Sequence, residues 1–345
     1  MSPVRIWLNR NYATSFHLIR QLRENPDGTP VHVVGSHVDP DSPVLAGCDE
    51  VVGEPEVSDP DFVDRCLQVC SDHRVQVFLP VAGQSQIARR RADFCAVGTA
   101  LICPPTEAVT LLGDKAATYR DLAGSDWVPP WRPATDLRSF EAALAELAEH
   151  WTAHHPLVVK PARGVGADGV RFLTRQPPTL QSLVGPAGPF VPASLYREAV
   201  ARATEIPELL VMAYLSGPET SVDVLAAQGR TVAAVPRSKS GRSRSIDGRP
   251  ELLAITEELV SRYRLDGLIN VQFRWFGDRP VLLEVNTRPS GGLFQSELAG
   301  VNLAWAAVRL ALGAPVAPLE PRLGTRYVTV SGLVRSAQPA ALVGR

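Results

Sequence analysis

The first hundred residues alternate between short apolar runs and segments with helical periodicity, and this alternation limits the folds open to the chain. The apolar runs read VRIWLN, PVHVVGS, VQVFLPV and ALICPP, and helical patterns lie between them near residues 15–24, 60–71 and 84–94. Parallel strands need a crossover connection, usually a helix, so this order predicts an open parallel sheet with flanking helices. Pro104 and Pro105 mark the expected end of this α/β domain.

The rest of the chain departs from this simple alternation. Helical patterns near residues 106–122, 137–150 and 251–263 are separated by the β-type runs PLVVKPA, GVRFLT, ELLVMAYL, ETSVDVLAA, RTVAAVPRS, NVQFRWF and PVLLEVN. Many strands with few crossover helices predict an α+β body with an antiparallel sheet. The Pro- and Gly-rich stretch 176–192 is expected to be a loop, and SAQPAALVGR at the end a frayed tail.

Composition argues against several classes of partner. The 345 residues carry a formal charge of -1 and are 45% hydrophobic, which gives no electrostatic case for nucleic acid or an anionic membrane. The start, MSPVRIWLNRNYATSF, has no uninterrupted apolar region, and no run reaches the roughly 18 apolar residues of a spanning helix. We therefore expect a cytoplasmic chain without a membrane or nucleic-acid partner.

The five cysteines are odd in number, show no CxxC spacing and stop before the midpoint of the chain. This pattern predicts reduced thiols rather than a disulfide framework, with the cysteines serving as small apolar core residues. An alternative interpretation places Cys66, Cys70 and His73 on one helical face as metal ligands.

Two biases restrict the chemistry of the second half of the chain. No histidine follows His155 and no cysteine follows Cys103, so acid-base or nucleophilic chemistry there cannot use either residue type. Only three of the 35 basic residues are lysines, namely Lys115, Lys160 and Lys239. A lysine among so many arginines indicates a position where a compact point charge is preferred.

Residues 282–292 read LLEVNTRPSGG and place a carboxylate, an amide and a guanidinium at alternate positions. Alternate side chains of an extended chain share a face, so Glu284, Asn286 and Arg288 are expected to point to the same side. The apolar or β-branched residues between them suit the opposite, core-facing side. This segment predicts a strand with one face for packing and one for chemistry.

The segment VVKPARGVGADGV places Lys160 at a strand end, ahead of Gly164, Gly166 and Gly169. Backbone N–H groups of such a loop, beside an ammonium group, suit phosphate oxygens. It is not a Walker A loop, because no GK[ST] closes it and no helix is expected there. Taken alone it is better interpreted as a hairpin connection, and LLGDKAATYRDL, LLVMAYLSGPETSVDVL and GLINVQFRWF also have ordinary interpretations when taken singly.

In this order, however, the segments resemble the ATP-grasp superfamily, which includes biotin carboxylase, D-alanine:D-alanine ligase and the synthetase halves of carbamoyl phosphate synthase. The resemblance spans roughly Thr106 to Val301. More narrowly, RIWLNRNYATSFHLIRQLRE, VDRCLQVCSDHRVQVFLP and LLGDKAATYRDL look like the ATP-grasp proteins encoded with tellurium-resistance-type operons.

The resemblance implies a fold that combines α/β and α+β parts. It divides the chain into an N-terminal pre-ATP-grasp domain with an open parallel sheet (1–105), linker helices and a lid subdomain (106–212), a catalytic subdomain with an antiparallel sheet (213–330), and a tail (331–345).

The resemblance also implies an ATP site. Two lysines match those that reach the nucleotide phosphates, and the glycine loop is expected to close over the phosphates. The backbone of four residues is expected to face adenine, and a glutamate to accept the ribose hydroxyls; Ala213 stands where relatives commonly have Glu. The residues concerned are Lys115, Lys160, Gly164, Gly166, Gly169, Met212, Ala213, Tyr214, Leu215 and Glu219.

A metal site follows from the same resemblance. Gln272, Glu284 and Asn286 match metal-ligand positions, and relatives carry Asp, Glu or Gln where this chain has Gln272. Oxygen ligands of this kind suit Mg²⁺. Arg288 is expected to hold the phosphoryl group in transfer, because its planar fork matches the oxygens.

The segment VPRSKSGRSRSIDGR concentrates cations after a strand. We expect an anion-binding flap over the acceptor, with Arg237 and Lys239 facing inward; a solvated loop is the alternative interpretation. Ser290 and nearby backbone N–H groups are expected to meet a substrate carboxylate. Catalytic roles are thus expected for Arg288, Lys160, Arg237 and Lys239.

The implied function is an ATP- and Mg²⁺-dependent ligase that activates a small-molecule carboxylate as an acyl phosphate for attack by an amine. Metal and cations neutralise the crowded oxygens, so no protein nucleophile is required. Two alternatives are phosphoryl transfer on the same fold and a nucleotide-binding regulatory protein with little turnover. A homodimer is compatible with all three.

Overall fold

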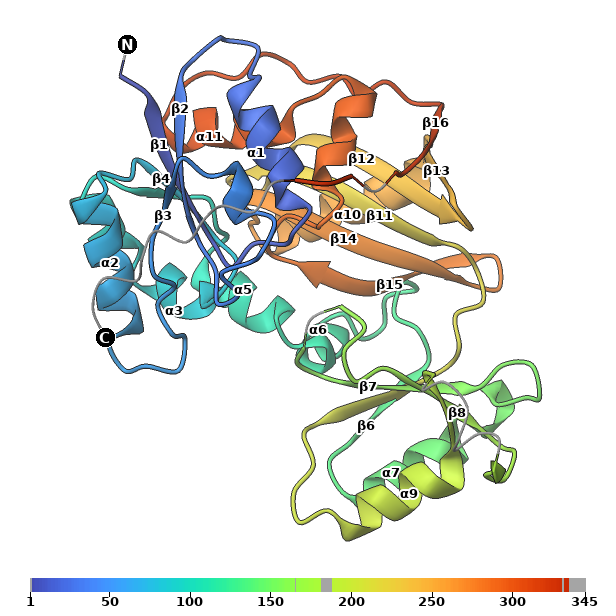
Figure 1. The fold of residues 1–345 in the computed structure, drawn as a ribbon. Coiled ribbons are helices and arrows are strands. Elements are labelled where there is room, and N and C mark those ends of the chain that lie inside the picture. Colours follow the sequence, from blue (N-terminus) through green and yellow to red (C-terminus); the bar gives the residue numbers. More distant parts are fainter. Residues whose placement is uncertain (1, 165, 181–187, 331, 335–345) are drawn as a thin grey trace. The chain divides into compact units, whose positions relative to one another are not determined.

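The structure, a computed structural model, describes residues 2–164, 166–180, 188–330 and 332–334 (Figure 1). The chain forms two compact units, each built from separate stretches of sequence. The first unit contains Met1–Thr110, Thr220–Val271 and Val285–Arg345, and the second contains Leu111–Glu219 and Gln272–Glu284. The domain limits expected at 105, 212 and 330 remain predictions.

The first unit contains a five-stranded sheet in the order β3-β2-β1-β4-β5. All neighbouring strands in it run parallel. Its strands are β1 (Val4–Asn9), β2 (Val31–Ser36), β3 (Glu50–Val51), β4 (Val77–Pro80) and β5 (Ala100–Leu101). This arrangement confirms the open parallel sheet predicted from the alternating pattern.

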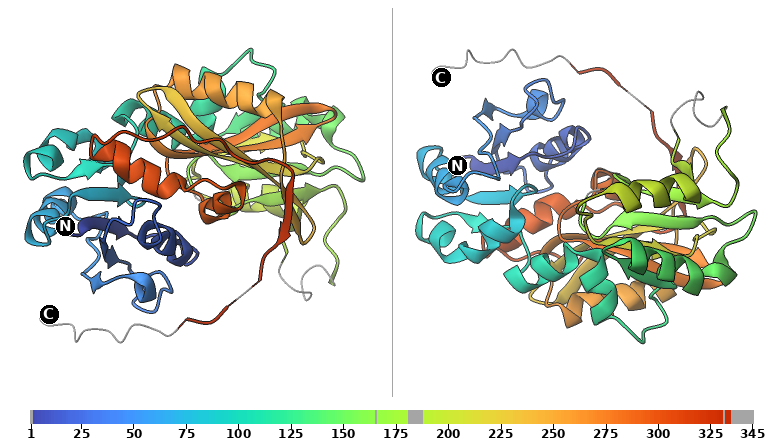
Figure 2. Two further views of the ribbon diagram at one scale, coloured as in Figure 1. Left: turned by 90° about the horizontal axis from the view of Figure 1, so that it is seen from above. Right: turned by 90° about the horizontal axis from the view of Figure 1, so that it is seen from below.

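Helices cover both faces of this sheet, because alternate side chains of β1 enter different cores. Ile6 and Leu8 join the apolar cluster that includes α1, whereas Trp7 joins the cluster of α2 and α4 and stacks on Phe78 with ring centroids 4.0 Å apart. The helices of this layer are α1 (Ser15–Arg23), η1 (Leu45–Gly47), α2 (Phe62–Asp72), α3 (Gln84–Arg89), α4 (Arg91–Ala96) and α5 (Thr106–Leu112). Helix α11 (Leu303–Ala311) packs against α1 within the same unit (Figure 2).

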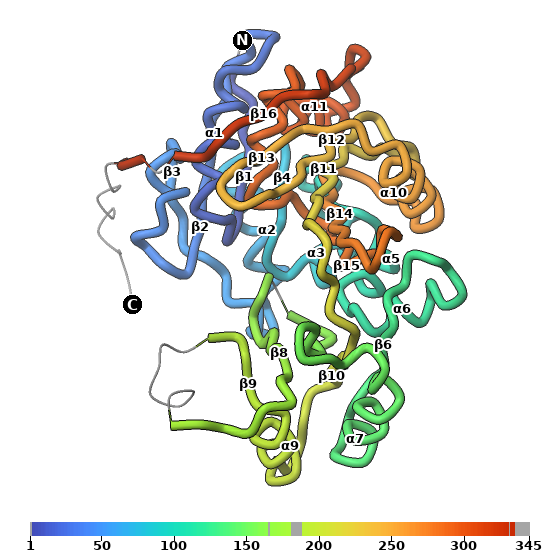
Figure 3. The backbone as a smooth tube through the Cα atoms, turned by 90° about the vertical axis from the view of Figure 1, so that its right-hand side faces the viewer, coloured from blue at the N-terminus to red at the C-terminus, as the bar shows by residue number. Residues whose placement is uncertain are grey.

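A second five-stranded sheet has the order β6-β10-β7-β8-β9. Strand β10 runs antiparallel to β6 and β7, and β8 runs antiparallel to β7 but parallel to β9. Helices α7 and α9 pack on it side by side (Figures 1 and 3). The elements of this part are α6 (Lys115–Asp121), β6 (Trp131–Ala134), α7 (Leu137–Glu146), η2 (Ala148–His150), β7 (Leu157–Pro161), β8 (Arg171–Thr174), β9 (Phe190–Pro192), α9 (Ala193–Arg202) and β10 (Leu209–Met212).

The third sheet has six strands in the order β15-β14-β11-β12-β13-β16. Strand β13 pairs antiparallel with both β12 and β16, as expected for the α+β body. The remaining elements are β11 (Glu219–Ala227), β12 (Arg230–Ser240), β13 (Ser243–Ile246), α10 (Pro250–Arg262), β14 (Gly267–Phe276), β15 (Arg279–Asn286), η3 (Leu293–Ala299) and β16 (Thr325–Val328).

Two expectations about local structure were wrong. The helix expected over 84–94 is two helices that meet at Arg90. The helix expected over 106–122 is also divided, because Asp114 adopts an extended conformation and its side chain caps α6 by accepting from the Ala117 N–H at 2.9 Å. The cationic segment, expected as an anion-binding flap or alternatively as a solvated loop, forms the hairpin between β12 and β13.

The sequence patterns also missed several elements. Strand β6 lies in a Pro-rich connection and forms only by pairing with β10. Helix α11 is buried over Leu303–Val308, and Arg309 is its one charged residue, so its sequence is mainly apolar. Of the loop predicted at 176–192, residues 181–187 lie outside the described residues and 190–192 form β9; the predicted tail lies outside them except for 332–334.

The cysteines remain free thiols, and Cys66, Cys70 and Cys103 are buried. Burial raises the pKa of Cys70 to about 12, as expected for an inert core residue. Within the described ranges, no group of three or more His, Cys, Asp or Glu side chains has the arrangement of a metal site. The same part of the chain contains no helix with the length and apolar character to cross a membrane.

Candidate functional site

The second unit contains a cavity of about 320 Å³ that is lined by most of the predicted nucleotide residues. Strands β7, β10, β14 and β15 and the glycine loop supply its walls. Gly164 and Gly169 do not line it. The lining residues are Lys115, Val158, Lys160, Gly166, Ala167, Val170, Phe172, Met212, Ala213, Tyr214, Leu215, Glu219, Gln272, Arg274, Leu283 and Glu284.

Lys160 is the most deeply buried cation of the cavity. Its side chain leaves β7, its residue is 5% exposed, and its Nζ donates to the carbonyl of Leu283 at 3.2 Å. The ammonium also lies 5.5 Å from the ring centroid of Tyr119. Burial lowers the pKa of Lys160 to about 7; repulsion by Lys115 adds to the shift and Glu284 opposes it. An anionic ligand beside Lys160 would raise its pKa again and so favour the charged ammonium form.

Lys115, at the start of α6, connects the glycine loop with β15. Its Nζ donates to the Gly164 carbonyl at 2.9 Å and lies 3.5 Å from Glu284 Oε2. Both side chains are nearly buried, at 9% and 11% exposure. Two lysines therefore share one nearby carboxylate, an excess of positive charge that favours a polyanionic ligand.

The glycine loop combines open and close-packed positions. Gly166 lines the cavity with φ of +61°, and a Cβ there would meet no atom within 4 Å. Gly169 has φ of +73°, and a Cβ there would lie 2.7 Å from Cγ of Pro161. Positive φ and this close approach explain the glycine at 169.

The wall after β10 is mainly apolar and suits a flat ring. Met212, Ala213 and Leu215 are buried, and Tyr214 packs between His155 and Phe172, each with its ring centroid 5.8 Å away. Ala213 uses its N–H to bind the carbonyl of Pro130 at 3.0 Å. These contacts hold the 212–215 segment against the cavity.

The sequence interpretation missed Arg274. It lines the same cavity as Gln272, two residues away on β14, and its buried Nε has no hydrogen-bond partner among the described residues. The sequence could have indicated Arg274, because Asn270, Gln272 and Arg274 stand at alternate positions of one strand and therefore share a face. A guanidinium in this position offers a donor to whatever fills the cavity.

Asn286 and Arg288 belong to the first unit, just beyond Glu284 on the chain. The strand end there is anchored by Thr287, whose hydroxyl donates to Gln84 Oε1 at 2.8 Å and whose carbonyl accepts from Gln84 Nε2 at 2.9 Å. Arg288 lies over the ring of Tyr12, 5.4 Å from its centroid. The anchored threonine fixes the direction in which the neighbouring polar side chains point.

Arg237 lies inside the first unit, whereas Lys239 is exposed. The Arg237 guanidinium pairs with the fully buried Asp223 and donates to Ser290 Oγ at 3.0 Å and Gln295 Oε1 at 3.1 Å. Burial disfavours the charge, but Asp223 overcomes this effect and holds the pKa of Arg237 above its usual value. The expectation that Lys239 faces inward is wrong in this structure, because Lys239 lies near the turn of the β12–β13 hairpin, where Ser240 and Gly241 are also exposed.

Known proteins are similar to this chain in sequence and in fold. Residues 205–333 match the family described as ATP-grasp in the biosynthetic pathway with Ter operon. Human carnosine synthase 1 is 30% identical in an alignment of 276 residues that covers 70% of this chain and 32% of that protein. The large chain of carbamoyl phosphate synthase from Streptomyces avermitilis is 26% identical over 232 residues, or 65% of this chain and 20% of that protein. The chain thus spans about a third or less of these relatives.

Solved structures show the same fold at low sequence identity. The biotin carboxylase domain of Hydrogenobacter thermophilus 2-oxoglutarate carboxylase, solved with MgADP, ADP and bicarbonate, matches with a TM-score of 0.62 and 16% identity, over 94% of this chain and 73% of that chain. N5-carboxyaminoimidazole synthetase from Staphylococcus aureus matches with a TM-score of 0.62 and 14% identity, over 91% of this chain and 78% of that chain.

The fold and the family match together make this chain a member of the ATP-grasp superfamily. Within it, residues 205–333 match the model of the ATP-grasp proteins encoded with Ter operons. Both levels of the resemblance seen in the sequence are thereby confirmed.

Proposed function

We propose that this protein is an ATP- and Mg²⁺-dependent ligase that joins a small-molecule carboxylate to an amine, with release of ADP and phosphate. The observation that carries the proposal is the cavity in which Lys115, Lys160, Gln272 and Glu284 meet beside the apolar 212–215 wall. The relatives point the same way, since their names describe synthases and a synthetase.

The cavity suits a nucleotide in three respects. The segment from Met212 to Leu215 offers an apolar wall for adenine, and Glu219 at the start of β11 is placed for ribose hydroxyls. Lys115 and Lys160 are placed for the phosphates, whose charge would restore the ammonium of Lys160. Gly166 exposes backbone at the same wall, so the loop is suited to close on the phosphates.

The donor set also suits Mg²⁺. Gln272 and Glu284 line the cavity and Asn286 follows Glu284 by two residues, so all three would offer oxygen to the ion. A single carboxylate leaves most of the charge to be balanced by phosphate oxygens, which matches the way Mg²⁺ is usually held. When bound, the ion would neutralise phosphate charge and orient the γ-phosphoryl group.

In the proposed reaction the substrate carboxylate attacks the γ-phosphorus, and the bond to the β-γ bridging oxygen breaks to release ADP. Lys160 and Arg288 would stabilise the charge of the transferring group. The amine then attacks the acyl phosphate, loses a proton and displaces phosphate. Arg237 would hold Ser290 and its loop in place, because its guanidinium donates a hydrogen bond to Ser290 Oγ.

The test is ADP production by the full chain with ATP and Mg²⁺, in the presence of pooled carboxylates, pooled amines, or both. A ligase releases ADP faster with both pools than with either one alone. ADP production that is saturated by the carboxylate pool and does not respond to amines would replace the proposal with simple phosphoryl transfer. Tight ADP binding without turnover under any pool would instead support a nucleotide-binding regulatory protein.

A further inference from the structure

The guanidinium of Arg288 lies over the ring of Tyr12, with its Cζ 5.4 Å from the ring centroid. Tyr12 follows β1 and Arg288 follows β15, and both belong to the first unit. A guanidinium within about 6 Å of an aromatic centroid is attracted to the face of the ring. The Tyr12 residue is 36% exposed, so its ring can be replaced with little disturbance of the core.

The two loops that carry these residues touch each other. A Cβ added to Gly291 would lie 3.1 Å from Thr14 Oγ1 and 3.7 Å from Tyr12 Cγ. The residue before Tyr12 is Asn11, which is 1% exposed and donates from Nδ2 to the carbonyl of Asn9 at 3.3 Å. The loop after β1 is therefore anchored to its strand, and the glycine lets the loop after β15 approach it closely.

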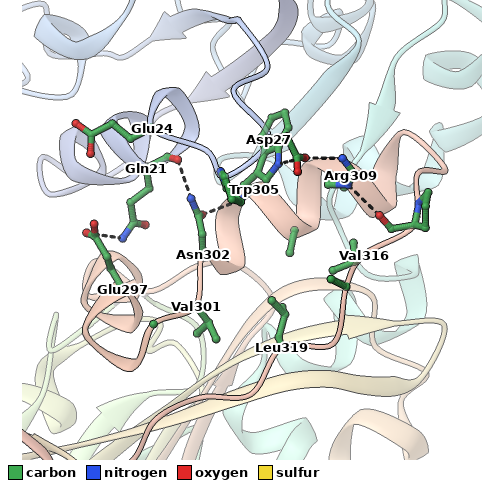
Figure 4. A pocket seen from close by; sticks show the side chains of 15 residues that line it. Gln21, Glu24, Asp27, Glu297, Val301, Asn302, Trp305, Arg309, Val316 and Leu319 are labelled. Carbon is green, nitrogen blue, oxygen red and sulfur yellow. Dashed lines mark hydrogen bonds and ion pairs between the residues drawn. The ribbon is translucent and has the colours of Figure 1, made fainter.

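The elements that follow the two loops are also joined. Residues 10–14 lead into α1 and residues 288–292 lead into η3. Beside a cavity of about 660 Å³, Gln21 on α1 donates from Nε2 to Glu297 Oε2 on η3 at 3.2 Å, as Figure 4 shows. The same Nε2 donates to the carbonyl of Phe294 at 2.6 Å. These bonds keep the segment that carries Tyr12 beside the segment that carries Arg288.

A further anchor holds the residue next to Arg288. The amide of Gln84 forms two hydrogen bonds with Thr287, and its Nε2 also donates to the carbonyl of Pro80 at the end of β4, at 2.9 Å. This anchor fixes the backbone at 287, but the long Arg288 side chain keeps several rotatable bonds. The ring of Tyr12 restrains the guanidinium end of that side chain.

We propose that Tyr12 is a positioning residue for Arg288, and that its ring holds the guanidinium in the orientation in which the planar fork meets the transferring phosphoryl group. The proposal rests on the function proposed above, and it makes the loop after β1 part of the machinery that orients Arg288. Orientation matters because a small misplacement of a catalytic group lowers the rate strongly. Tyr12 acts through Arg288, so its loss should lower kcat and spare the binding of ATP.

The kinetic test compares variants of the full chain with ATP, Mg²⁺ and the pools that support ADP production. Tyr12→Leu removes the aromatic face and should lower kcat roughly tenfold, while the KM for ATP changes by less than about twofold. Tyr12→Phe keeps the face and should stay close to the parent. Tyr263→Leu, at the end of α10, is the matched control: Arg262 lies over that ring at 5.8 Å, and the variant should keep the kcat of the parent.

A double-mutant cycle shows whether Tyr12 acts through Arg288. In an Arg288→Lys background, Tyr12→Leu should change kcat by less than about twofold, because no planar guanidinium remains to be oriented. A purely structural role would give the same factor in both backgrounds, since independent effects are additive in free energy. The proposal is overturned by equal factors, by a parental kcat in Tyr12→Leu, or by Tyr12→Phe losing as much activity as Tyr12→Leu.

NMR of protein labelled with 15N-arginine gives a readout without turnover. The Nε–H resonance of Arg288 is the one that Arg288→Lys lacks. Its heteronuclear NOE should be near that of rigid backbone in the parent and in Tyr12→Phe, and should fall clearly in Tyr12→Leu. Equal mobility in the parent and Tyr12→Leu would overturn the positioning role whatever the turnover. An ordered Arg288 in a parent without turnover would refute the ligase reaction and still support Tyr12 as the residue that orders Arg288.

Discussion

The Nζ of Lys115 lies 3.5 Å from Oε2 of Glu284 and 2.9 Å from the carbonyl oxygen of Gly164. One ammonium group thereby contacts both β15 and the glycine loop. Because Lys160 is buried nearby and its pKa is lowered to about 7, the second cation of the cavity is held at a cost in stability. Several predictions about charge and nucleotide binding rest on this arrangement.

Glu284→Gln should greatly reduce Mg²⁺-dependent ADP production and should also lower the melting temperature, because Lys115 loses a nearly buried ion pair. The substitution keeps size and hydrogen bonding but removes the only carboxylate among Gln272, Glu284 and Asn286. Loss of one charged contact costs about 1.5–3 kcal/mol, so turnover should fall roughly 10- to 150-fold. Glu257→Gln, at an exposed position on α10, is the control and should keep full activity. Normal activity in Glu284→Gln would remove this residue from the metal site.

Lys160→Met should raise the stability of the empty protein at neutral pH. The pKa of Lys160 is lowered in the folded state from 10.5 to about 7, so between these values the unfolded chain binds more protons. The free energy of unfolding therefore rises with pH across this window, and the full penalty of burying the lysine applies below pH 7. A shift of this size corresponds to at most about 4–5 kcal/mol. Denaturant unfolding at several pH values should show a gain at pH 7 that shrinks toward pH 10; a loss at pH 7 would contradict the argument.

Nucleotide binding should take up protons at mildly alkaline pH. Phosphate favours the charged form of Lys160 and raises its pKa from the value near 7 of the empty cavity, so affinity should fall as pH rises above 7. The check is calorimetry of ADP binding at about pH 8 in buffers of different ionisation enthalpy. Lys160→Met should bind ADP more weakly and without this proton uptake. Equal uptake by parent and variant would assign the proton to another group.

Gly169→Ala should damage the glycine loop by steric conflict as well as by backbone strain. The new Cβ would lie 2.7 Å from Pro161 Cγ at φ of +73°. Gly124→Ala provides the control, because its φ is +88° but its Cβ would meet no atom within 4 Å and it lies outside the glycine loop. Strain of about 1–2 kcal/mol is expected in both, so only Gly169→Ala should also weaken ADP binding. Equal ADP affinity of the two variants would show that the 169 contact does not shape the site.

Arg237→Ala should affect mainly the stability of the first unit, whereas Lys239→Ala should affect at most the acceptor KM. Removing Arg237 leaves the buried Asp223 without its ion pair, so the first unit should lose about 3–5 kcal/mol of stability. Lys239 is exposed, and its removal should leave the melting temperature unchanged. If the hairpin nevertheless serves the acceptor, Lys239→Ala should raise the acceptor KM and leave the ATP KM unchanged. An unchanged acceptor KM in Lys239→Ala would show that Lys239 is a solvated side chain without a role in acceptor binding.

Much of the fold was readable from local patterns. The alternation of strands and helices predicted the parallel sheet, and the order of the glycine loop, the 212–215 segment and LLEVNTRPSGG indicated the superfamily. In β15 and the two residues after it the pattern extended to single residues, since Val285 and Thr287 are buried while Asn286 and Arg288 are partly exposed. Leu283 departs from the pattern, because it lines the nucleotide cavity together with Glu284. Period-2 patterning is a property of the strand backbone itself, so it can be recognised before any partner strand is known.

The remaining features depend on contacts between distant parts of the chain, and only the tertiary structure decided them. Strand β6 is stabilised by pairing with β10. The Arg237 side chain faces inward because it forms an ion pair with the buried Asp223 on β11. The contact of Tyr12 with Arg288 requires the loops before α1 and η3 to meet. Composition and periodicity describe which residues can be buried or extended, whereas a buried ion pair or an unfilled cavity depends on the distance between atoms that the sequence places far apart.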